Sequence, residues 1–183
     1  MAEDQSYPRV KKFFFLFIFI LSFSKANSEN FKFIKIANLN NPWGSSFLNN
    51  DEMIITEKSG LIKIVNIINN QVNDVEHNLN FLEDGQGGLL DILYQENKVW
   101  ISYTENRGNR KTSTSIALAN LDKKNLVFKN IFQANPPINS GYHFGSRLAI
   151  KDNYLYASAG ERGKGMIAQD LSLIHISEPT RHR

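Results

Sequence analysis

The sequence has no cysteine, so it contains neither a disulfide framework nor a thiolate metal site. It also has no window that keeps a helical period with capping signals at both ends, which argues against a helical domain. Long hydrophobic runs are lacking as well. The apolar run that starts at Phe13 continues for about a dozen residues, short of the roughly 17 that a membrane-spanning helix needs. A chain without disulfides must owe its stability to its packed core.

A net charge is also lacking once the two ends of the chain are set aside. The formal charge of +3 comes from residues 1–28, which hold four basic and two acidic side chains, and from residues 171–183, which hold two basic and one acidic. Residues 29–170 are neutral on the same count. Clustered Lys and Arg on one face, the usual footprint of a nucleic-acid-binding domain, are not indicated, so we expect no nucleic-acid partner.

Residues 1–28 have the composition of a secretory signal peptide. Lys11 and Lys12 form a basic flank, the apolar run follows, and the small residues Ala26 and Ser28 offer a cleavage site. We therefore expect a periplasmic or secreted protein with no stable membrane span after cleavage. A retained N-terminal anchor is the alternative.

The C-terminal residues 171–183 do not continue the pattern of the chain. Residues 171–181 reproduce the translation of a transposase adapter used to build sequencing libraries. We therefore expect residues 171–183 to be an adapter translation rather than native sequence, and we exclude them from the fold. On this interpretation the natural sequence is interrupted near Asp170; a genuine irregular tail is the alternative.

The residues between these ends show a β pattern throughout. Ser59 and Gly60 separate two β-branched runs, which is a hairpin signal. The expected strands are residues 31–36, 53–56, 61–65, 89–94, 99–103, 115–119, 126–128, 147–150 and 154–158. Short strands at regular intervals favour a sandwich, a barrel or a propeller.

An internal repeat favours the propeller among these. An apolar pair, a polar turn and a strand recur with Met53, Val99 and Tyr154 at equivalent positions, 46 and 55 residues apart. Propeller blades run about 40–50 residues, although hairpins with Asn or Asp turns occur in any all-β protein. Residues 29–170 would then hold about three blades, whereas propellers close with about four to eight. Because an open arc exposes its end faces, we expect this chain alone to be poorly soluble or unfolded.

A histidine and a carboxylate flank the last expected hairpin. His143 precedes the strand at residues 147–150, and Glu161 follows the strand at residues 154–158, 18 residues after His143. Two short strands and a turn of this length return the chain to its starting edge, so the two side chains are expected to meet. A His held by a carboxylate is the common arrangement of a general base. A single His before a strand is, by itself, more often structural or solvated than catalytic.

Three different segments together form a further pattern, because they follow one another in a fixed order and at the spacing of propeller blades. They are Asn41-Pro42-Trp43-Gly44 with Thr56-Glu57, then Gly85-Gln86-Gly87-Gly88, then His143-x-Gly145-x-Arg147-Leu148 with Gly160-x-x-Gly163. This pattern resembles the glucose/sorbosone dehydrogenase family, soluble aldose sugar dehydrogenases that depend on pyrroloquinoline quinone (PQQ). The resemblance implies an all-β fold in which residues 29–170 form the N-terminal part, about three blades, of a six-bladed β-propeller.

The resemblance implies roles for individual residues. His143 would be the general base that takes the proton of the sugar's anomeric hydroxyl while hydride passes to the quinone. Glu161 matches the family's supporting acid, usually Asp, and would hold one ring nitrogen of His143. Gln86 would bind the substrate near the reacting carbon, and Arg147 would give structural support by pairing with a buried carboxylate. Tyr142 stands where glucose-oxidising members have an acidic residue, which argues against glucose as the substrate.

PQQ and Ca²⁺ are the cofactors that the resemblance implies. The Arg, Asn and Lys residues that hold PQQ, and the calcium ligands, are expected in later blades beyond residue 170. Neither the cofactor-binding residues nor a metal site is therefore expected in this chain, which should be inactive by itself. Its parent would oxidise a small aldose and pass electrons to an acceptor that the sequence does not identify.

Two other functions fit a propeller. A non-enzymatic exported propeller could bind a glycan or a protein partner, because propellers host many unrelated functions. A hydrolytic propeller would use a central calcium held by inward-facing Glu, Asn and Asp residues from several blades, a set that this sequence does not convincingly offer. Channel-facing Arg and Lys residues in later blades would distinguish the dehydrogenase from the binding protein.

Overall fold

The computed structural model of this chain describes residues 32–165. The chain divides into a short unit that ends at Ile34 and a larger unit that begins at Lys35. The described residues of the short unit, residues 32–34, have no regular structure, and the larger unit contains every strand described below. The predicted signal peptide and the predicted adapter translation lie outside the described residues.

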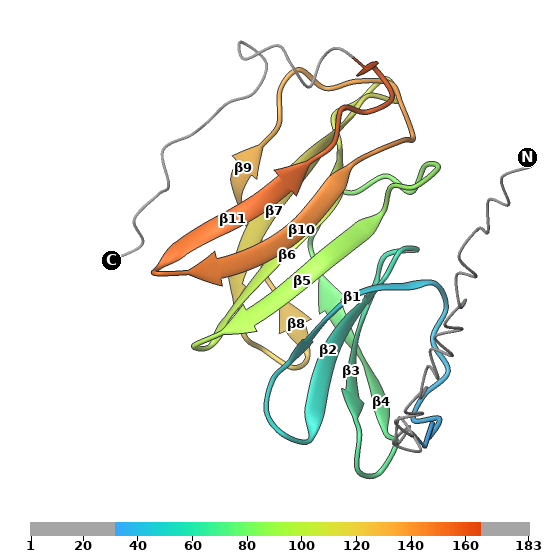
Figure 1. Cartoon of the computed structure of the whole chain (residues 1–183), viewed down its shortest axis with the longest axis vertical. Coiled ribbons are helices and arrows are strands. Elements are labelled where there is room, and N and C mark those ends of the chain that lie inside the picture. Colours follow the sequence, from blue (N-terminus) through green and yellow to red (C-terminus); the bar gives the residue numbers. More distant parts are fainter. Residues whose placement is uncertain (1–31, 166–183) are drawn as a thin grey trace, which may run out of the picture. The chain divides into compact units, whose positions relative to one another are not determined.

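The first sheet is antiparallel and follows chain order (Figure 1). Its strands are β1 (Pro42–Phe47), β2 (Glu52–Glu57), β3 (Leu61–Asn66) and β4 (Val72–His77). The short β8 (Asn125–Leu126) pairs in parallel with β4 although it comes from the chain segment that builds the second sheet. β8 therefore ties the first sheet to the second.

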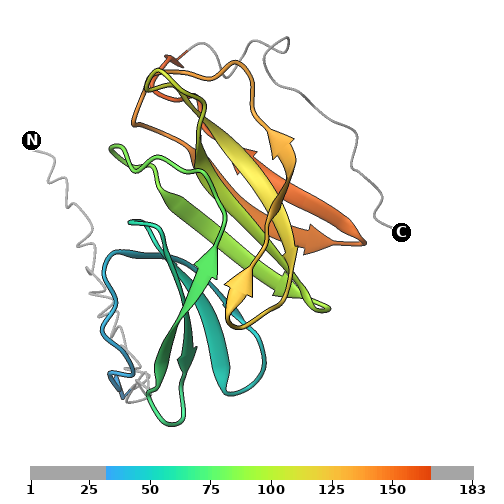
Figure 2. The same ribbon diagram turned by 180° about the vertical axis from the view of Figure 1, so that it is seen from behind.

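The second sheet repeats the four-stranded antiparallel plan, and a third sheet begins it again. The second sheet consists of β5 (Leu89–Gln95), β6 (Lys98–Asn106), β7 (Thr112–Asn120) and β9 (Lys129–Gln133). The third is the hairpin of β10 (Gly145–Lys151) and β11 (Tyr154–Ala159). Seen from either side, β5 lies between β1 and β10, and it contacts both (Figures 1 and 2).

This arrangement confirms the predicted all-β propeller fold. Successive four-stranded antiparallel sheets that place their first strands side by side are propeller blades. The predicted three blades are two complete sheets and the first two strands of a third. Residues 32–165 contain no α-helix.

Two tight hairpin turns confirm the internal repeat. Glu96 and Asn97 have φ values of 49° and 63°, and Asp152 and Asn153 have 51° and 64°, the left-handed pair that a two-residue type I′ turn requires. The predicted register of the third copy is wrong by one residue. Tyr154 pairs at the hairpin end as Lys98 does, so Leu155 is the residue equivalent to Val99.

One predicted strand is not formed over its described residues, and three observed strands, β1, β4 and β9, were not predicted. The predicted strand at residues 31–36 is not formed over its described residues 32–36, and Phe33 is 96% exposed. Its alternating pattern has no pairing strand among residues 32–165, and a lone strand cannot satisfy its backbone groups. β4 and β9 were missed because both are edge-like and mostly exposed.

The same irregularity occurs between the first and second strands of all three sheets. The register shifts so that two residues of the first strand face one residue of the second, which is a β-bulge. Each bulge is filled by a hydroxyl of the second strand, from Thr56, Ser102 and Ser158, which we call the bulge hydroxyls. Each accepts a hydrogen bond of 2.9–3.0 Å from a bulge amide; these amides belong to Gly44, Asp91 and Arg147.

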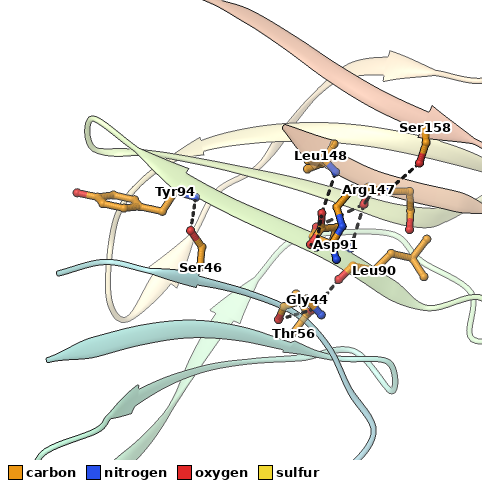
Figure 3. A network of polar contacts seen from close by, with 11 residues as sticks. Gly44, Ser46, Thr56, Leu90, Asp91, Tyr94, Arg147, Leu148 and Ser158 are labelled. Carbon is orange, nitrogen blue, oxygen red and sulfur yellow. Dashed lines mark hydrogen bonds and ion pairs between the residues drawn. The ribbon is translucent and has the colours of Figure 1, made fainter. Parts of the chain in front are cut away.

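Two of the bulge hydroxyls also reach the next sheet. Thr56 Oγ1 donates to the carbonyl of Leu90 at 2.5 Å, and Ser102 Oγ donates to that of Ser146 at 2.7 Å. Figure 3 shows the first of these contacts between the ribbons of two sheets. One hydroxyl thus joins two strands of its own sheet to the first strand of the following sheet.

Apolar packing is distributed unevenly between the sheets. The larger buried cluster joins the first and second sheets and contains thirteen residues: Ile54, Ile62, Ile64, Val75, Leu89, Ile92, Val99, Ile101, Tyr103, Ala117, Ala119, Leu126 and Phe128. The smaller cluster joins the second and third sheets through Trp100, Ile116 and Leu148. Because the hydrophobic contribution scales with buried apolar area, the first junction supplies most of the stability.

Candidate active site

His143 lies on the loop that connects β9 to β10. Its backbone has a φ of 49°, a left-handed conformation that is uncommon for a residue with a side chain. Its side chain is 54% exposed, and the ring of the equally exposed Tyr142 lies edge-on to it, with 6.3 Å between ring centroids. The loop therefore presents an imidazole to solvent from a constrained backbone position.

Glu161 follows β11 and contacts His143. Its Oε1 is paired with Nδ1 of the imidazole and also accepts the backbone N–H of Gly163 at 3.2 Å. The hydrogen bond with His143 is the main cause that lowers the pKa of Glu161, and backbone N–H groups add to it. Gly160 makes this approach possible, since a Cβ there would lie 1.9 Å from the carbonyl oxygen of His143.

The contact with Glu161 determines which ring nitrogen of His143 is available. An ionised carboxylate is an acceptor, so a neutral imidazole beside it places its proton on Nδ1. The lone pair then lies on Nε2. The predicted meeting of His143 and Glu161 is observed, and it leaves one ring nitrogen as a proton acceptor.

Gln86 lies beside the same loop, on the glycine-rich turn before β5. Its backbone N–H donates to the carbonyl of Gly141 at 2.7 Å, and its side-chain Oε1 accepts the N–H of His143 at 2.9 Å. Gly85 has a φ of +56°, and a Cβ there would lie 2.4 Å from the Gly141 carbonyl oxygen. Gln86 thus holds the His143 backbone with its oxygen, while its Nε2 has no acceptor among residues 32–165. Its predicted contact with substrate stays a prediction.

Arg147 pairs with Asp91 of the neighbouring sheet. The distance from Arg147 Nη1 to Asp91 Oδ1 is 3.3 Å, and Asp91 Oδ2 accepts the N–H of Leu148 at 2.8 Å (Figure 3). The Asp91 side chain is 7% exposed and that of Arg147 is 79% exposed. Asp91 therefore fixes the start of β10 from the second sheet. Among residues 32–165, Arg147 makes no hydrogen bond or ion pair with His143 or Glu161.

Arg162 is a site residue that the sequence analysis missed. It directly follows Glu161, is 6% exposed, and its guanidinium lies 3.7 Å from the centroid of the Phe144 ring. Burial lowers its pKa to about 10, against an opposing effect of Asp84. A signal was available, because the glycines at 160 and 163 that enclose Arg162 indicate close packing of its backbone.

Metal-ligand groups are sparse in the described part of the chain. No group of three His, Cys, Asp or Glu side chains that could hold a metal ion occurs among residues 32–165. The same residues include no helix of the length and apolarity that crossing a membrane demands.

Comparison with known proteins shows the family of this chain. The sequence profile of the Glucose / Sorbosone dehydrogenase family matches residues 39–175. Aldose sugar dehydrogenase YliI of Escherichia coli (strain K12) is 30% identical over 143 residues, which cover 73% of this chain and 38% of that protein.

Solved structures share the fold. The apo-form crystal structure of the soluble aldose sugar dehydrogenase from Escherichia coli has a TM-score of 0.69 and 28% identity, over 74% of this chain and 42% of that one. The PQQ-bound aldose sugar dehydrogenase from Streptomyces coelicolor has a TM-score of 0.65 and 22% identity, over 75% and 43% of the two chains. The chain thus spans about two-fifths of the length of these relatives.

Proposed function

Because this chain belongs to the glucose/sorbosone dehydrogenase family, we propose that it is the N-terminal part of an exported quinoprotein that oxidises aldose sugars at the anomeric carbon. The observation that carries the proposal is the pairing of Glu161 with Nδ1 of an exposed His143. This pair provides a general base next to open space, which the reaction requires. We use the term full-length protein for the complete protein of which this chain would be the N-terminal part.

His143 is the proposed base. Its Nε2 accepts the proton of the anomeric hydroxyl as hydride leaves the anomeric carbon, and the hemiacetal becomes a lactone. Glu161 stabilises the imidazolium that forms, because its carboxylate already accepts from Nδ1. A positioned base of this kind contributes about 10²- to 10⁴-fold to the rate.

Gln86 and Tyr142 are the proposed substrate contacts. The Oε1 of Gln86 is engaged by His143, so the Nε2 group is the donor that would meet a sugar oxygen. Tyr142 is 61% exposed beside the imidazole, and an aromatic face or edge packs against the C–H surface of a sugar ring. An aromatic residue here, in place of an acidic one, favours an aldose other than glucose.

PQQ is the proposed cofactor, and the family of this chain supports it. When bound, it supplies the acceptor for the hydride and its two electrons. Its carboxylates need cations or N–H donors, and both arginines near His143 already have acceptors: Arg147 on Asp91 and Arg162 on Thr112. We therefore place the anchors for those carboxylates, and a Ca²⁺ site, beyond residue 170.

Export is proposed from residues 1–28 alone. Their basic flank, short apolar run and small residues are typical of a signal peptide, and they support a periplasmic or secreted enzyme. Sequencing the N-terminus of the mature full-length protein tests this, because cleavage near Ala26 or Ser28 is expected and an intact Met1 would contradict it.

The enzymatic proposal is tested with the full-length protein loaded with PQQ. We expect oxidation of one or more aldoses with an artificial electron acceptor, and a fall in kcat of about 10²- to 10⁴-fold in His143→Ala. His77→Gln is the matched control, because His77 bonds the Gly60 carbonyl at 2.8 Å in the first sheet and should leave kcat unchanged. A protein that binds sugars without oxidising any of them would instead be the non-enzymatic propeller. Unchanged kcat in His143→Ala would remove His143 as the base.

A further inference from the structure

The loop that carries His143 has little regular structure of its own. Residues 139–144 form no strand, and the backbone of His143 has the unfavourable φ of 49°. A general base must nevertheless stay within a fraction of an ångström of its working position. Something outside the loop must therefore fix its backbone.

The Arg162 side chain reaches this loop at several points. Its Nε donates to the carbonyl of Tyr142 at 3.1 Å, and its Nη2 contacts the carbonyl of Ser140. The Arg162 backbone N–H donates to the carbonyl of His143 at 3.3 Å. Three carbonyls of the loop are thus bound by one residue.

The other side of the same guanidinium is bound to the second sheet. Nη1 donates to the carbonyl of Thr112 at 3.1 Å, and Nη2 donates to its Oγ1 at 2.7 Å. The cation also lies on the ring of buried Phe144 at 3.7 Å, a cation–π contact. Arg162 therefore connects the His143 loop to the start of β7, an element that belongs to a complete sheet.

From these contacts we infer that Arg162 is a positioning residue that fixes the backbone of the His143 loop, while its neighbour Glu161 fixes the imidazole ring. For its effect on catalysis the inference rests on the proposed function. Two adjacent residues then act on one histidine, one through main-chain carbonyls and one through Nδ1.

The chemistry of the site explains why the residue is an arginine. The planar guanidinium presents five donors in fixed directions, and four of its contacts here lie in different directions. A lysine would offer a single charged centre on a flexible stem. Burying this cation is unfavourable, since no carboxylate lies within ion-pair distance of it among residues 32–165. The carbonyl acceptors and the Phe144 ring offset that cost.

The first measurement is spectroscopic and does not depend on turnover. The ¹⁵N shifts of the His143 ring, recorded on histidine-labelled full-length protein at a pH where the ring is neutral, report which nitrogen carries the proton. We expect the Nδ1–H form in the wild type, as the contact with Glu161 requires. Arg162→Met should give a mixture of the two tautomers, because a displaced loop no longer presents Nδ1 to Glu161. Arg162→Lys should lie between the two.

The second measurement is kinetic, with the PQQ-loaded protein and an aldose that it oxidises. We expect kcat to fall on the order of 10²-fold in Arg162→Met, the effect of misplacing a catalytic group by about 1 Å. The KM for the sugar should change little, and Arg162→Lys should recover part of kcat. Ile54→Val is the control for general loosening, because Ile54 is buried in the first sheet away from the loop. It should change neither the tautomer nor kcat.

The outcomes separate the two proposals. Wild-type ring shifts in both Arg162 variants would overturn the positioning role, as would the same tautomer change in Ile54→Val. If the wild-type protein oxidises no aldose while Arg162→Met still alters the tautomer, the positioning role stands and the proposed function fails.

Discussion

The junction between the first and second sheets and the junction between the second and third are built from different interactions. The first is filled by most of the thirteen-residue apolar cluster, whereas three buried apolar residues join the second sheet to the third. Polar contacts occur at both junctions, for example from the Tyr94 N–H to Ser46 Oγ at the first, but at the second they act beside much less apolar packing. Asp91 binds the N–H of Leu148, and Thr114 Oγ1 donates to the carbonyl of Phe144 at 2.9 Å.

This difference separates stability from positioning. Apolar contacts are strong in sum but non-directional, so they hold two sheets together without fixing one loop to a fraction of an ångström. Hydrogen bonds contribute less net free energy each, about 1 kcal/mol, but they specify direction. At the junction next to His143 such bonds act with little apolar packing beside them, which is where a base must be placed accurately.

The largest expected effect is a loss of stability at the first junction. Ile101→Ala removes a fully buried side chain from the larger cluster and should lower the free energy of unfolding by about 2–5 kcal/mol. Leu148→Ala, in the smaller cluster, should lower it by less, because fewer buried neighbours surround the cavity. Urea denaturation of the full-length protein measures both. An equal or larger loss in Leu148→Ala would break the comparison.

An intermediate effect is expected from Asp91 at the second junction. Asp91→Ala leaves the Leu148 N–H without its acceptor, which should cost about 1–3 kcal/mol. Asp91→Asn keeps a carbonyl oxygen and should cost less. Hydrogen exchange at the Leu148 amide should become faster in Asp91→Ala. An unchanged exchange rate would mean that other contacts fix the start of β10.

The bulge hydroxyls should give smaller effects of similar size at the two junctions. Thr56→Val and Ser102→Ala each remove a hydroxyl that bonds both its own sheet and the next, and each should cost about 1 kcal/mol. Ser158→Ala is the matched comparison, because within residues 32–165 that hydroxyl only accepts from Arg147. Thermal or urea unfolding of the three variants measures these losses in the free energy of unfolding. Widely different losses in Thr56→Val and Ser102→Ala would contradict the shared role.

The smallest expected effect concerns acid stability at the site. The pKa of Glu161 is lowered in the folded protein by its hydrogen bond with His143. A depressed carboxyl pKa stabilises the fold above the ordinary value of 4.5, and the contribution is lost as the pH falls below it toward the folded pKa. As the pH falls from 4.5 toward the folded pKa, Glu161→Gln should therefore lose slightly less stability than the wild type. Identical pH profiles of Tm would show that the contact makes no net contribution.

The elements predicted well from the sequence are those with local causes. The turn at Asp152-Asn153, and Asn97 in the turn at Glu96-Asn97, were indicated by residue types that tolerate a left-handed backbone. Gly60, with a φ of +106°, lies in the turn of the hairpin that Ser59-Gly60 predicted. The strands between such turns followed from their β-branched runs. The all-β class was therefore available before any tertiary contact was known.

The elements predicted poorly depend on partners that the local pattern does not contain. Residues 32–36 alternate like a strand but pair with none in the described chain. β4 and β9 pair with strands although their own residues are largely polar and exposed. The meeting of His143 with Glu161 followed from the hairpin length, because it spans one local unit. Arg162 was missed because its acceptors lie at 112, 140 and 142, which only the folded chain brings together.

The bulge hydroxyls have a consequence for how such a fold can grow. Thr56 and Ser102 occupy the same position in successive sheets, and each donates to a carbonyl in the bulge of the sheet that follows. The second sheet therefore carries both a donor on its second strand and an acceptor on its first. A duplicated copy of such a sheet already encodes the donor and the acceptor that hydrogen-bond it to the sheets on either side. It therefore needs no new mutation to make these two bonds.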